Sequence, residues 1–201
     1  TNVIHSQWAC NQHVWKPVKT KQDIGVSFVG QYNAARGATV SALRKAGVDV
    51  WARGWGWPEG RLSSDDMIKS FSRSKVNLNF NTPPNRLRLR LLARLFLRRS
   101  AGRIVLDLAH VKDNIKSWIN MAIPQIKARP FEILGCRTFL ISARADNMGD
   151  YYEDRKEIVY YDGSTKDLAE KIRYYLKHDE ERERIARASY ERTLREHTYE
   201  Q

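Results

Sequence analysis

The sequence predicts an α/β fold, a Rossmann-like parallel sheet with helices on both faces. Short apolar runs of β-branched and aromatic residues predict buried strands, and segments with helical spacing lie between them. Strands that alternate with helices in this way indicate βαβ units, whose strands run parallel and are covered on both faces. The chain has 201 residues, of which 42% are hydrophobic. This is enough for one good core or for two small domains.

The predicted elements follow one another in a regular order after a lead-in segment. Residues 1–22 are rich in Trp, His and Lys without a clear period, so we place the domain at residues 23–201. Its predicted strands are 23–30, 48–52, 75–80, 138–142 and 157–161. Its predicted helices are 33–46, 63–73, 125–135, 164–177 and 180–195.

Local signals mark several of these boundaries. Gly47 ends the first helix. Ser63 or Ser64 can cap the second helix, and Ser164 followed by Asp167 resembles a capping box that opens the fourth. The helical segments are therefore supported by end signals as well as by spacing.

The loops that follow the strands are expected to form the ligand site, because ligands bind beyond the carboxyl ends of the strands in parallel α/β sheets. The predicted topology brings five loops to one rim: 30–36, 53–60, 80–84, 124–132 and 142–150. Charged residues in these loops are therefore the first candidates for ligand contact.

The segment Gln125–Cys136 carries such charges. It places two cations, Lys127 and Arg129, and one carboxylate, Glu132, on a predicted helix that leads into a buried strand. A helix N-terminus attracts anions because its first amides lack partners and its dipole is positive. Glu132, about one turn later, can accept hydrogen bonds from hydroxyl groups. The layout fits a phosphate and a polyol, as in a nucleotide sugar; the alternative is a solvated helix start with ordinary surface charges.

A basic insert interrupts the Rossmann pattern at residues 83–123. The net charge of the chain is +12, and seven arginines without any acidic residue lie between Pro84 and Leu106. The basicity is therefore local and marks one surface. Between Arg86 and Arg99 the arginines and leucines follow both a period of two and a helical spacing. We expect a helix, because Leu, Ala and Arg are good helix formers and β-branched residues are absent there.

Three partners could explain this basic segment. Leucines and Phe96 beside the arginines of Arg86–Arg99 suit docking on an anionic membrane surface, where a lipid-linked acceptor would wait. The same surface could instead pack against an absent domain. Nucleic acid is the least favoured partner, because the stacked aromatics of RNA-binding strand pairs are absent from the sequence.

Cysteine usage and hydropathy indicate the compartment. Cys10 and Cys136 form no metal or redox motif, which suits a reducing cytoplasm. No apolar run approaches the roughly 20 residues that a membrane span needs. We therefore expect a cytoplasmic protein, at most peripheral at the inner membrane face. We expect no cofactor and no metal, because no Asp-x-Asp motif stands beside a strand end.

A set of short motifs recurs in a fixed order along the chain: Phe28-Val-Gly30 with Arg36, Arg53–Trp57, Ile126–Glu132 with Gly135-Cys136, Glu157–Tyr161, Asp167-Leu168, Ile172–Leu176, Glu181-Arg182, Ile185-Ala186 and Glu196–Tyr199. These motifs resemble the C-terminal half of a GT-B-fold glycosyltransferase in their order and spacing. The resemblance runs from about Val14 to the chain end. The resemblance is closest to group-1-type transferases related to CgeB-like spore-maturation proteins. It implies a Rossmann-like domain that binds a nucleotide-diphosphate sugar donor.

The resemblance also implies roles for single residues of Gln125–Cys136. Glu132 stands where the glutamate of the family accepts hydrogen bonds from the ribose hydroxyls. Lys127 and Arg129 would face the diphosphate, where charge-assisted hydrogen bonds also stabilise the leaving group.

Further roles fall on the first two loops. Gly30 would let the backbone approach the phosphates, and Arg36 is a further phosphate partner. The loop from Gly54 to Trp57, with Trp55, would lie beside the base.

Structural explanations compete with several of these roles. Almost any tight turn after a strand needs a glycine such as Gly30, and Arg36 fits an ordinary first-turn helix residue. Trp55 and Trp57 could pack under a loop, and His197 fits a packed residue better than a catalyst.

One position departs from the pattern of the family, and one half of the enzyme is not in the chain. Relatives have glycine just after the cysteine, where a positive φ is permitted; this chain has Arg137, which tolerates that φ poorly. We therefore expect a local change in the helix-to-strand turn.

The resemblance implies an N-terminal domain that binds the acceptor and usually supplies the catalytic base, so we assign no catalytic residue.

The predicted function is that of a hexosyltransferase-like domain that binds a nucleotide-diphosphate sugar for transfer to an unknown acceptor. The sequence alone leaves two alternatives to this function. One is a basic nucleic-acid-binding module on an α/β scaffold, whose binding would fall steeply with salt. The other is a non-catalytic interaction domain.

Overall fold

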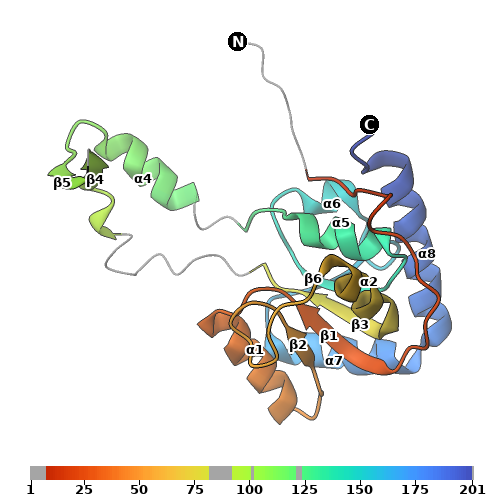
Figure 1. Ribbon diagram of the computed structural model, residues 1–201. Coiled ribbons are helices and arrows are strands. Elements are labelled where there is room, and N and C mark those ends of the chain that lie inside the picture. The colour runs from red at the N-terminus through yellow and green to blue at the C-terminus, as the bar shows by residue number, and fades with distance from the viewer. Residues whose placement is uncertain (1–7, 82–91, 101, 121–123, 201) are drawn as a thin grey trace. The chain divides into compact units, whose positions relative to one another are not determined.

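The computed structural model describes residues 8–81, 92–100, 102–120 and 124–200 (Figure 1). The chain divides into two compact units. The larger unit consists of Thr1–Asn81 and Ile126–Gln201, and the inserted unit consists of Thr82–Gln125. Each unit is described separately below.

The larger unit is built on a parallel sheet of five strands, in the order β2-β1-β3-β6-β7. The strands are β1 (Ile24–Val29), β2 (Trp51–Arg53), β3 (Ser74–Asn79), β6 (Leu140–Ala143) and β7 (Val159–Tyr161). Each corresponds to one of the predicted strands. The α/β parallel-sheet prediction is therefore confirmed.

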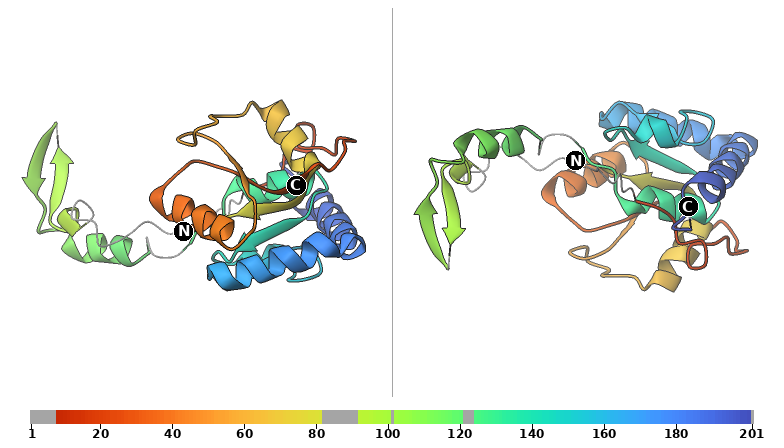
Figure 2. Two further views of the ribbon diagram at one scale, coloured as in Figure 1. Left: turned by 90° about the horizontal axis from the view of Figure 1, so that it is seen from below. Right: turned by 90° about the horizontal axis from the view of Figure 1, so that it is seen from above.

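Helices cover both faces of this sheet (Figures 1 and 2). The helices of the larger unit are α1 (Ala34–Lys45), α2 (Ser64–Arg73), α5 (Ala128–Gly135), α6 (Met148–Tyr151), α7 (Thr165–Lys177) and α8 (Asp179–Glu196). Residues of α1 and α7 belong to the core on one face, and residues of α2 and α5 belong to the core on the other. The long helix α8 packs against both α7 and α5.

Alternate side chains of β1 and β6 enter the two cores. In β1, Val26 and Phe28 pack on the α1/α7 side, and Val29 packs on the α2/α5 side. In β6, Leu140 and Ile141 divide in the same way. This is the period-two alternation of a pleated strand that is buried on both faces.

Helix caps form where the sequence supplies short polar residues. The Ser63 side chain accepts a hydrogen bond from the Asp66 backbone N–H, and Ser164 accepts one from Asp167 N–H. Between the two expected caps of α2, Ser63 is therefore the one that is used. These bonds satisfy backbone donors that have no partner within the helix.

The strand order creates a crevice at the carboxyl end of β1. From β1 the chain passes through α1 to β2 on one side, and it then passes through α2 to β3 on the other side. The connections on the two sides lie on opposite faces of the sheet, so the loops after the strands separate there. This position is where a parallel α/β sheet offers a ligand site.

The described part of the lead-in segment packs into the larger unit. The side chain of Cys10 is fully buried. The backbone N–H of Cys10 donates to the His197 carbonyl at 2.7 Å, and Tyr199 N–H donates to the Cys10 carbonyl at 3.2 Å. A Cβ at Gly135, the last residue of α5, would overlap the Cys10 sulfur. Residues that precede position 23 are therefore part of this unit.

The inserted unit contains a hairpin and a helix. Strands β4 (Leu97–Ser100) and β5 (Arg103–Leu106) pair antiparallel, and α4 (Val111–Asn120) follows them. The prediction of a helix over Arg86–Arg99 is wrong for residues 97–99, which form a strand. Residues 86–91 of the predicted helix lie outside the part of the chain that the structure describes. Gly102, with a φ of +78°, allows the tight turn. The β-branched pair Ile104-Val105 favours the partner strand.

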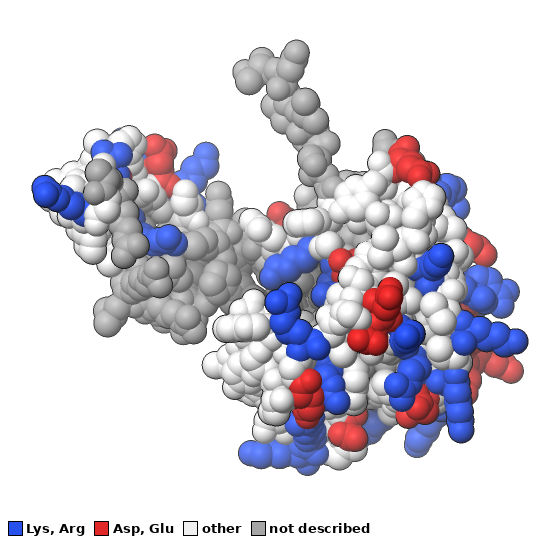
Figure 3. Space-filling model, in the orientation of Figure 1, with Lys and Arg blue, Asp and Glu red and all other residues white. Residues whose placement is uncertain are grey.

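The two units differ in charge. Residues 82–125 contain nine Lys or Arg and two Asp, a net charge of +7, which leaves +5 for the rest of the chain. Basic and acidic side chains are interspersed over the visible face of the larger unit (Figure 3). The unbalanced charge therefore belongs mainly to the inserted unit.

Candidate functional site

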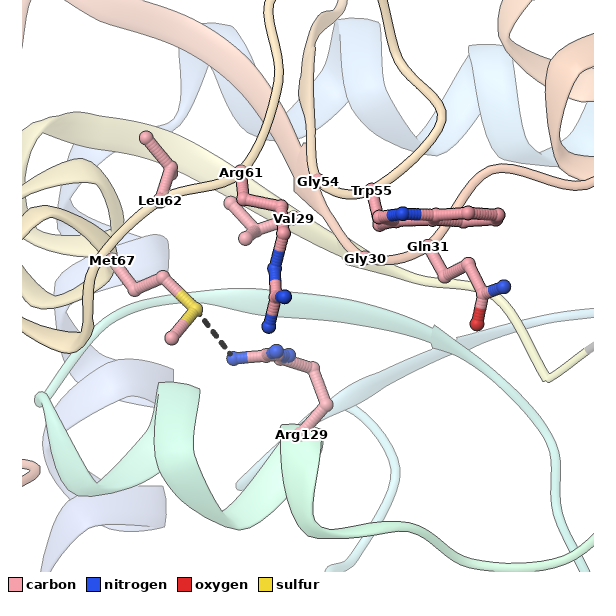
Figure 4. A pocket seen from close by; sticks show the side chains of 9 residues that line it. All are labelled: Val29, Gly30, Gln31, Gly54, Trp55, Arg61, Leu62, Met67 and Arg129. Carbon is pink, nitrogen blue, oxygen red and sulfur yellow. Dashed lines mark hydrogen bonds between the residues drawn. The ribbon is translucent and has the colours of Figure 1, made fainter.

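A pocket of about 420 Å³ lies at the carboxyl end of β1. It is lined by Val29, Gly30, Gln31, Gly54, Trp55, Arg61, Leu62, Met67 and Arg129 (Figure 4). The lining comes from the end of β1, the loop after β2, the start of α2 and the start of α5. Four of the predicted site residues, Gly30, Gly54, Trp55 and Arg129, are thus brought together from three separate segments.

Two arginines approach each other across this pocket. Arg61 descends from the loop before α2 and Arg129 rises from α5, so that their guanidinium groups point toward one another (Figure 4). Within the described residues, the Arg61 side chain makes no hydrogen bond or ion pair. Two like charges that face each other across open space repel, and an anion between them removes that repulsion. The arrangement therefore suits a bound anion.

Arg129 is held in place by contacts on three sides. Its Nη1 donates to the Met67 sulfur at 3.2 Å, and its guanidinium lies 5.7 Å from the centre of the Phe71 ring. Its Nη1 also lies 2.6 Å from Glu132 Oε2. These contacts fix the side chain before any ligand arrives, which lowers the entropy cost of binding.

Glu132 lies one turn behind Arg129 and does not itself line the pocket. Its Oε2 is buried, and the nearby Arg129 N–H is not aligned for a hydrogen bond, so this oxygen has no hydrogen-bond donor among the described residues. Burial raises the pKa of Glu132, and the positive charge of Arg129 partly offsets that rise. A buried acceptor without a donor is costly. A hydroxyl group on a ligand could satisfy it.

Arg36 joins two loops at the rim. Its Nη1 donates to the Gln31 carbonyl at 2.7 Å and its Nη2 donates to the Phe80 carbonyl at 3.2 Å. Its Nε is buried without a partner in the part of the chain that the structure describes. Burial lowers the pKa of Arg36, and the charge of Arg129 lowers it further. Arg36 is therefore a structural tie between loops as well as a member of the cationic cluster.

Lys127 is the N-cap residue of α5, so the helix begins three residues later than predicted. The side chain makes no capping hydrogen bond. Burial lowers the pKa of Lys127, and the charge of Arg36 adds to that effect. Arg36, Lys127 and Arg129 thus lie close enough to influence one another, although only Arg129 lines the pocket.

Gly30 and Gly54 form a close backbone contact in the pocket. Gly54 has a φ of +136°, and a Cβ there would overlap the Gly30 carbonyl oxygen. A Cβ at Gly30 would come 2.8 Å from the Phe28 ring. Gly54 is therefore needed for the close contact between the two loops, whereas a side chain at Gly30 would require a shift of the Phe28 ring.

The two tryptophans of the loop differ in their environment. Trp57 is 8% exposed and packs edge-on against Phe28 and Tyr32. Its indole Nε1 donates to the Gly30 carbonyl at 2.9 Å. Trp55 is 62% exposed and lines the pocket. Packing therefore explains Trp57, while the Trp55 ring is available to a ligand.

His197 packs among aromatic rings. Its ring centre lies 5.1 to 5.8 Å from those of Tyr152, Tyr151 and Phe131, and the side chain is 5% exposed. This agrees with the packed role that was preferred over catalysis.

Sequence reasoning missed five lining residues: Val29, Gln31, Arg61, Leu62 and Met67. The available signal was position, since Arg61 and Leu62 lie directly between the expected rim loop 53–60 and the Ser63 cap. In the described part of the chain, no group of three or more His, Cys, Asp or Glu could hold a metal ion. No helix of the described residues is long and apolar enough to cross a bilayer.

The family follows from a match over most of the chain. The model of the glycosyl transferase-like family matches residues 17–201, and the chain belongs to that family. With its parallel sheet, it is a GT-B glycosyltransferase domain. No curated protein is significantly similar in sequence.

Solved structures share the fold at low sequence identity. Sucrose-phosphate synthase from Thermosynechococcus elongatus matches with a TM-score of 0.64 and 10% identity over 96% of this chain and 48% of that chain. TarM matches with a TM-score of 0.58 and 11% identity over 93% of this chain and 35% of that chain. The C-terminal domain of the group 1 glycosyl transferase LpcC from Francisella tularensis matches with a TM-score of 0.54 and 10% identity over 94% and 99%. This chain thus spans about half the length of the sucrose-phosphate synthase chain, about a third of the TarM chain and nearly all of the LpcC domain.

Proposed function

We propose that this domain binds a nucleotide-diphosphate sugar, the donor in a glycosyl transfer reaction, in the pocket at the end of β1. The observation that carries the proposal is the approach of Arg61 and Arg129 across that pocket (Figure 4). Membership of a glycosyl transferase-like family supports a sugar donor. The facing guanidinium groups support a donor whose leaving group is a phosphate anion.

The diphosphate would lie between Arg61 and Arg129, with Lys127 and Arg36 adding positive potential. Guanidinium groups form paired, charge-assisted hydrogen bonds with phosphate oxygens. These bonds strengthen as negative charge develops on the departing nucleoside diphosphate, so they favour the transition state over the ground state. Because four cations are available for this charge, we propose that binding needs no metal ion.

The nucleoside would extend from the diphosphate between Trp55 and Glu132. The exposed indole of Trp55 offers a flat surface on which a base can stack. The buried Oε2 of Glu132 is ion-paired with Arg129 but accepts no aligned hydrogen bond from the described residues, so it would accept one from a ribose hydroxyl. Because Arg129 contacts Glu132 at 2.6 Å, the same arginine would couple the ribose and diphosphate subsites.

A second domain would supply the acceptor site and the catalytic base. The chain covers 48% of sucrose-phosphate synthase and 35% of TarM, and the described pocket lining offers no obvious general base beside the two arginines. This part of the proposal predicts donor binding by the chain, and transfer only when an acceptor-binding domain is present.

Isothermal titration calorimetry with UDP, GDP, TDP and their sugars, in the presence of EDTA, tests the donor site. At least one nucleotide should bind, and Arg61→Ala and Arg129→Ala should each weaken it about 10- to 100-fold, as expected for charged hydrogen bonds. Arg187→Ala, an exposed arginine of α8, is the matched control and should bind normally. Absence of any binding, or unchanged affinity in both pocket variants, would refute the proposal.

The role of Glu132 has a separate test. Wild-type protein should bind the ribonucleoside diphosphate more tightly than its 2′,3′-dideoxy analogue, which lacks both ribose hydroxyls. In Glu132→Ala that preference should disappear, because the acceptor is gone. If the variant kept the full preference, another group would have to recognise the ribose.

A further inference from the structure

The hairpin of the inserted unit has one apolar, solvent-exposed face. Leu97 pairs with Leu106, and Ile104 lies two residues before Leu106 on the partner strand, so the side chains of these three residues lie on the same face of the hairpin. The exposed fractions are 37% for Leu97, 67% for Ile104 and 65% for Leu106. Three large aliphatic side chains thus form a face that no described residue of this unit covers.

More apolar side chains are exposed in the same small unit. Phe96 and Leu108, which flank the hairpin, are 47% and 64% exposed. Ile115 and Ile119, one turn apart on α4, are 40% and 51% exposed. Scattered apolar residues are normal on a surface, but a concentration of this kind marks an interaction surface.

Positive charge lies elsewhere on the same unit: Arg98, which pairs with Val105, and Arg103, which pairs with Ser100, belong to the opposite face of the hairpin. Arg94, Arg98 and Arg103 are all exposed, and residues 82–125 carry a net charge of +7. One of the two carboxylates of the unit, Asp107, is already occupied: it lies 2.7 Å from His110 Nδ1 and 3.9 Å from Arg98 Nε. The unit therefore presents arginines with little acidic surface to balance them.

We propose that the inserted unit docks on an anionic phospholipid bilayer, with Leu97, Ile104 and Leu106 in the acyl boundary and the arginines at the level of the phosphates. The combination of exposed aliphatic groups and unbalanced positive charge matches the two phases of that interface. Nucleic acid offers phosphates but no apolar phase for Ile104 and Leu106. Protein interfaces are depleted of charge at their centres and favour aromatic anchors, whereas this hairpin has an aliphatic face and arginines on its opposite face.

Vesicle sedimentation with the whole 201-residue chain tests this proposal, which does not depend on nucleotide binding. The protein should sediment with vesicles of phosphatidylcholine mixed with phosphatidylglycerol, and not with pure phosphatidylcholine. Added salt should weaken binding, because it screens the attraction between exposed charges. Binding to neither vesicle, or equal binding to both, would overturn the proposal.

Charge variants test whether vesicle binding depends on the inserted unit or on the positive charge of the whole chain. Arg94→Glu combined with Arg103→Glu should lower binding to the anionic vesicles at least about tenfold, since each basic residue near such a surface contributes measurably. Lys166→Glu combined with Arg187→Glu makes the same change of charge at exposed positions of the larger unit. Equal loss in both double variants would overturn the proposal.

Apolar variants test insertion of the hairpin face in both directions. Ile104→Ser should lower binding to the anionic vesicles, and Ile104→Trp should raise it about tenfold or more, because indole partitions well into the bilayer interface. The gain is measured against sedimentation of the same variant without vesicles, so that aggregation of a misfolded variant is not counted as binding. Two results would contradict the proposal: no change in either variant, or wild-type binding to oligonucleotides or to a second copy of the chain without binding to vesicles.

Discussion

Arg137 shows how one residue can depart from what its backbone position favours. It follows α5 and its C-cap Cys136, and it has a φ of +56°. Its N–H donates to the Leu134 carbonyl at 3.0 Å, which is how helices commonly end in a left-handed residue. Arg137 thus keeps the left-handed conformation that glycine favours, with its side chain exposed to solvent, so the expected local change in this turn is wrong.

Arg137→Gly should stabilise the domain by about 1 kcal/mol, because glycine adopts this φ without the steric cost that a Cβ brings. The gain is limited by the larger entropy of glycine in the unfolded chain. Arg137→Ala keeps the Cβ and should give no such gain. Urea unfolding of the three proteins measures the difference. Equal stability of the Gly and Ala variants would show that the turn carries no strain.

Glu132 should make stability depend on pH. Its folded-state pKa is raised above 4.5, first by burial, with Arg129 opposing the rise. The folded chain therefore holds this proton more tightly than the unfolded chain does. The stability that this carboxyl contributes is fully present below the unfolded-state pKa and is lost as the pH rises through the folded-state pKa.

The Glu132→Gln variant lacks the titrating group. The unfolding free energy of the variant minus that of the wild type should therefore increase as the pH rises above 4.5. Urea unfolding at several pH values measures this difference. Glu180→Gln, at an exposed position of α8, is the control and should show no such trend. A Glu132→Gln difference that stayed constant or shrank with pH would contradict the burial argument.

At the scale of elements, the pocket depends on how the loops after β1 and β2 pack. Gly54 contacts the Gly30 backbone directly, and Trp57 anchors the same loop through the Gly30 carbonyl. The loop is therefore a rigid wall of the pocket, and the Trp55 ring is presented from it.

Gly54→Ala should destabilise the domain by more than about 2 kcal/mol and weaken nucleotide binding, because it combines a glycine-only φ with overlap on Gly30. Gly60→Ala in the same loop separates the two effects. Gly60 has a φ of +76° but open space where a methyl group would lie, so its substitution should cost only about 1 kcal/mol. Urea unfolding and calorimetry measure both variants. Equal effects of the two substitutions would mean that the overlap with Gly30 is relieved by a small shift that costs little free energy.

At the scale of the whole molecule, the larger unit holds all of the five-stranded sheet and all of the pocket. Every strand of that sheet and every lining residue belongs to Thr1–Asn81 or Ile126–Gln201. The inserted unit enters the chain between β3 and α5 and adds its own hairpin. Donor binding and surface docking are thus assigned to different units.

Replacement of residues 82–125 by a flexible Gly/Ser linker should leave a folded domain. Its unfolding free energy should change by less than about 0.5 kcal/mol, because the sheet and both cores remain intact. Nucleotide affinity should persist and binding to anionic vesicles should be lost. Urea unfolding, calorimetry and vesicle sedimentation measure the three properties. Loss of cooperative unfolding would show that the inserted unit supports the core.

Local pattern predicted the strands of the larger unit and all of its described helices except the short α6, because the period of buried side chains and the capping residues are properties of neighbouring positions. It also predicted that Gly30, Gly54, Trp55 and Arg129 would share a rim, since parallel strands end on one side. It was wrong for the hairpin at 97–106, where pairing across Gly102 outweighed the helical propensity of Leu and Arg. Propensity is a weak prior when a partner strand is available.

The sequence by itself determined that this protein is an α/β domain with an anion-suited helix start at Gln125–Cys136. Only the tertiary structure decided that Arg61 faces Arg129 across the pocket, that Glu132 keeps a buried oxygen without an aligned donor among the described residues, and that Arg36 ties two loops. The physical reason is distance along the chain. Periodicity reports on residues a few positions apart, whereas Arg61 and Arg129 meet only because the order of strands brings their loops to one end of the sheet.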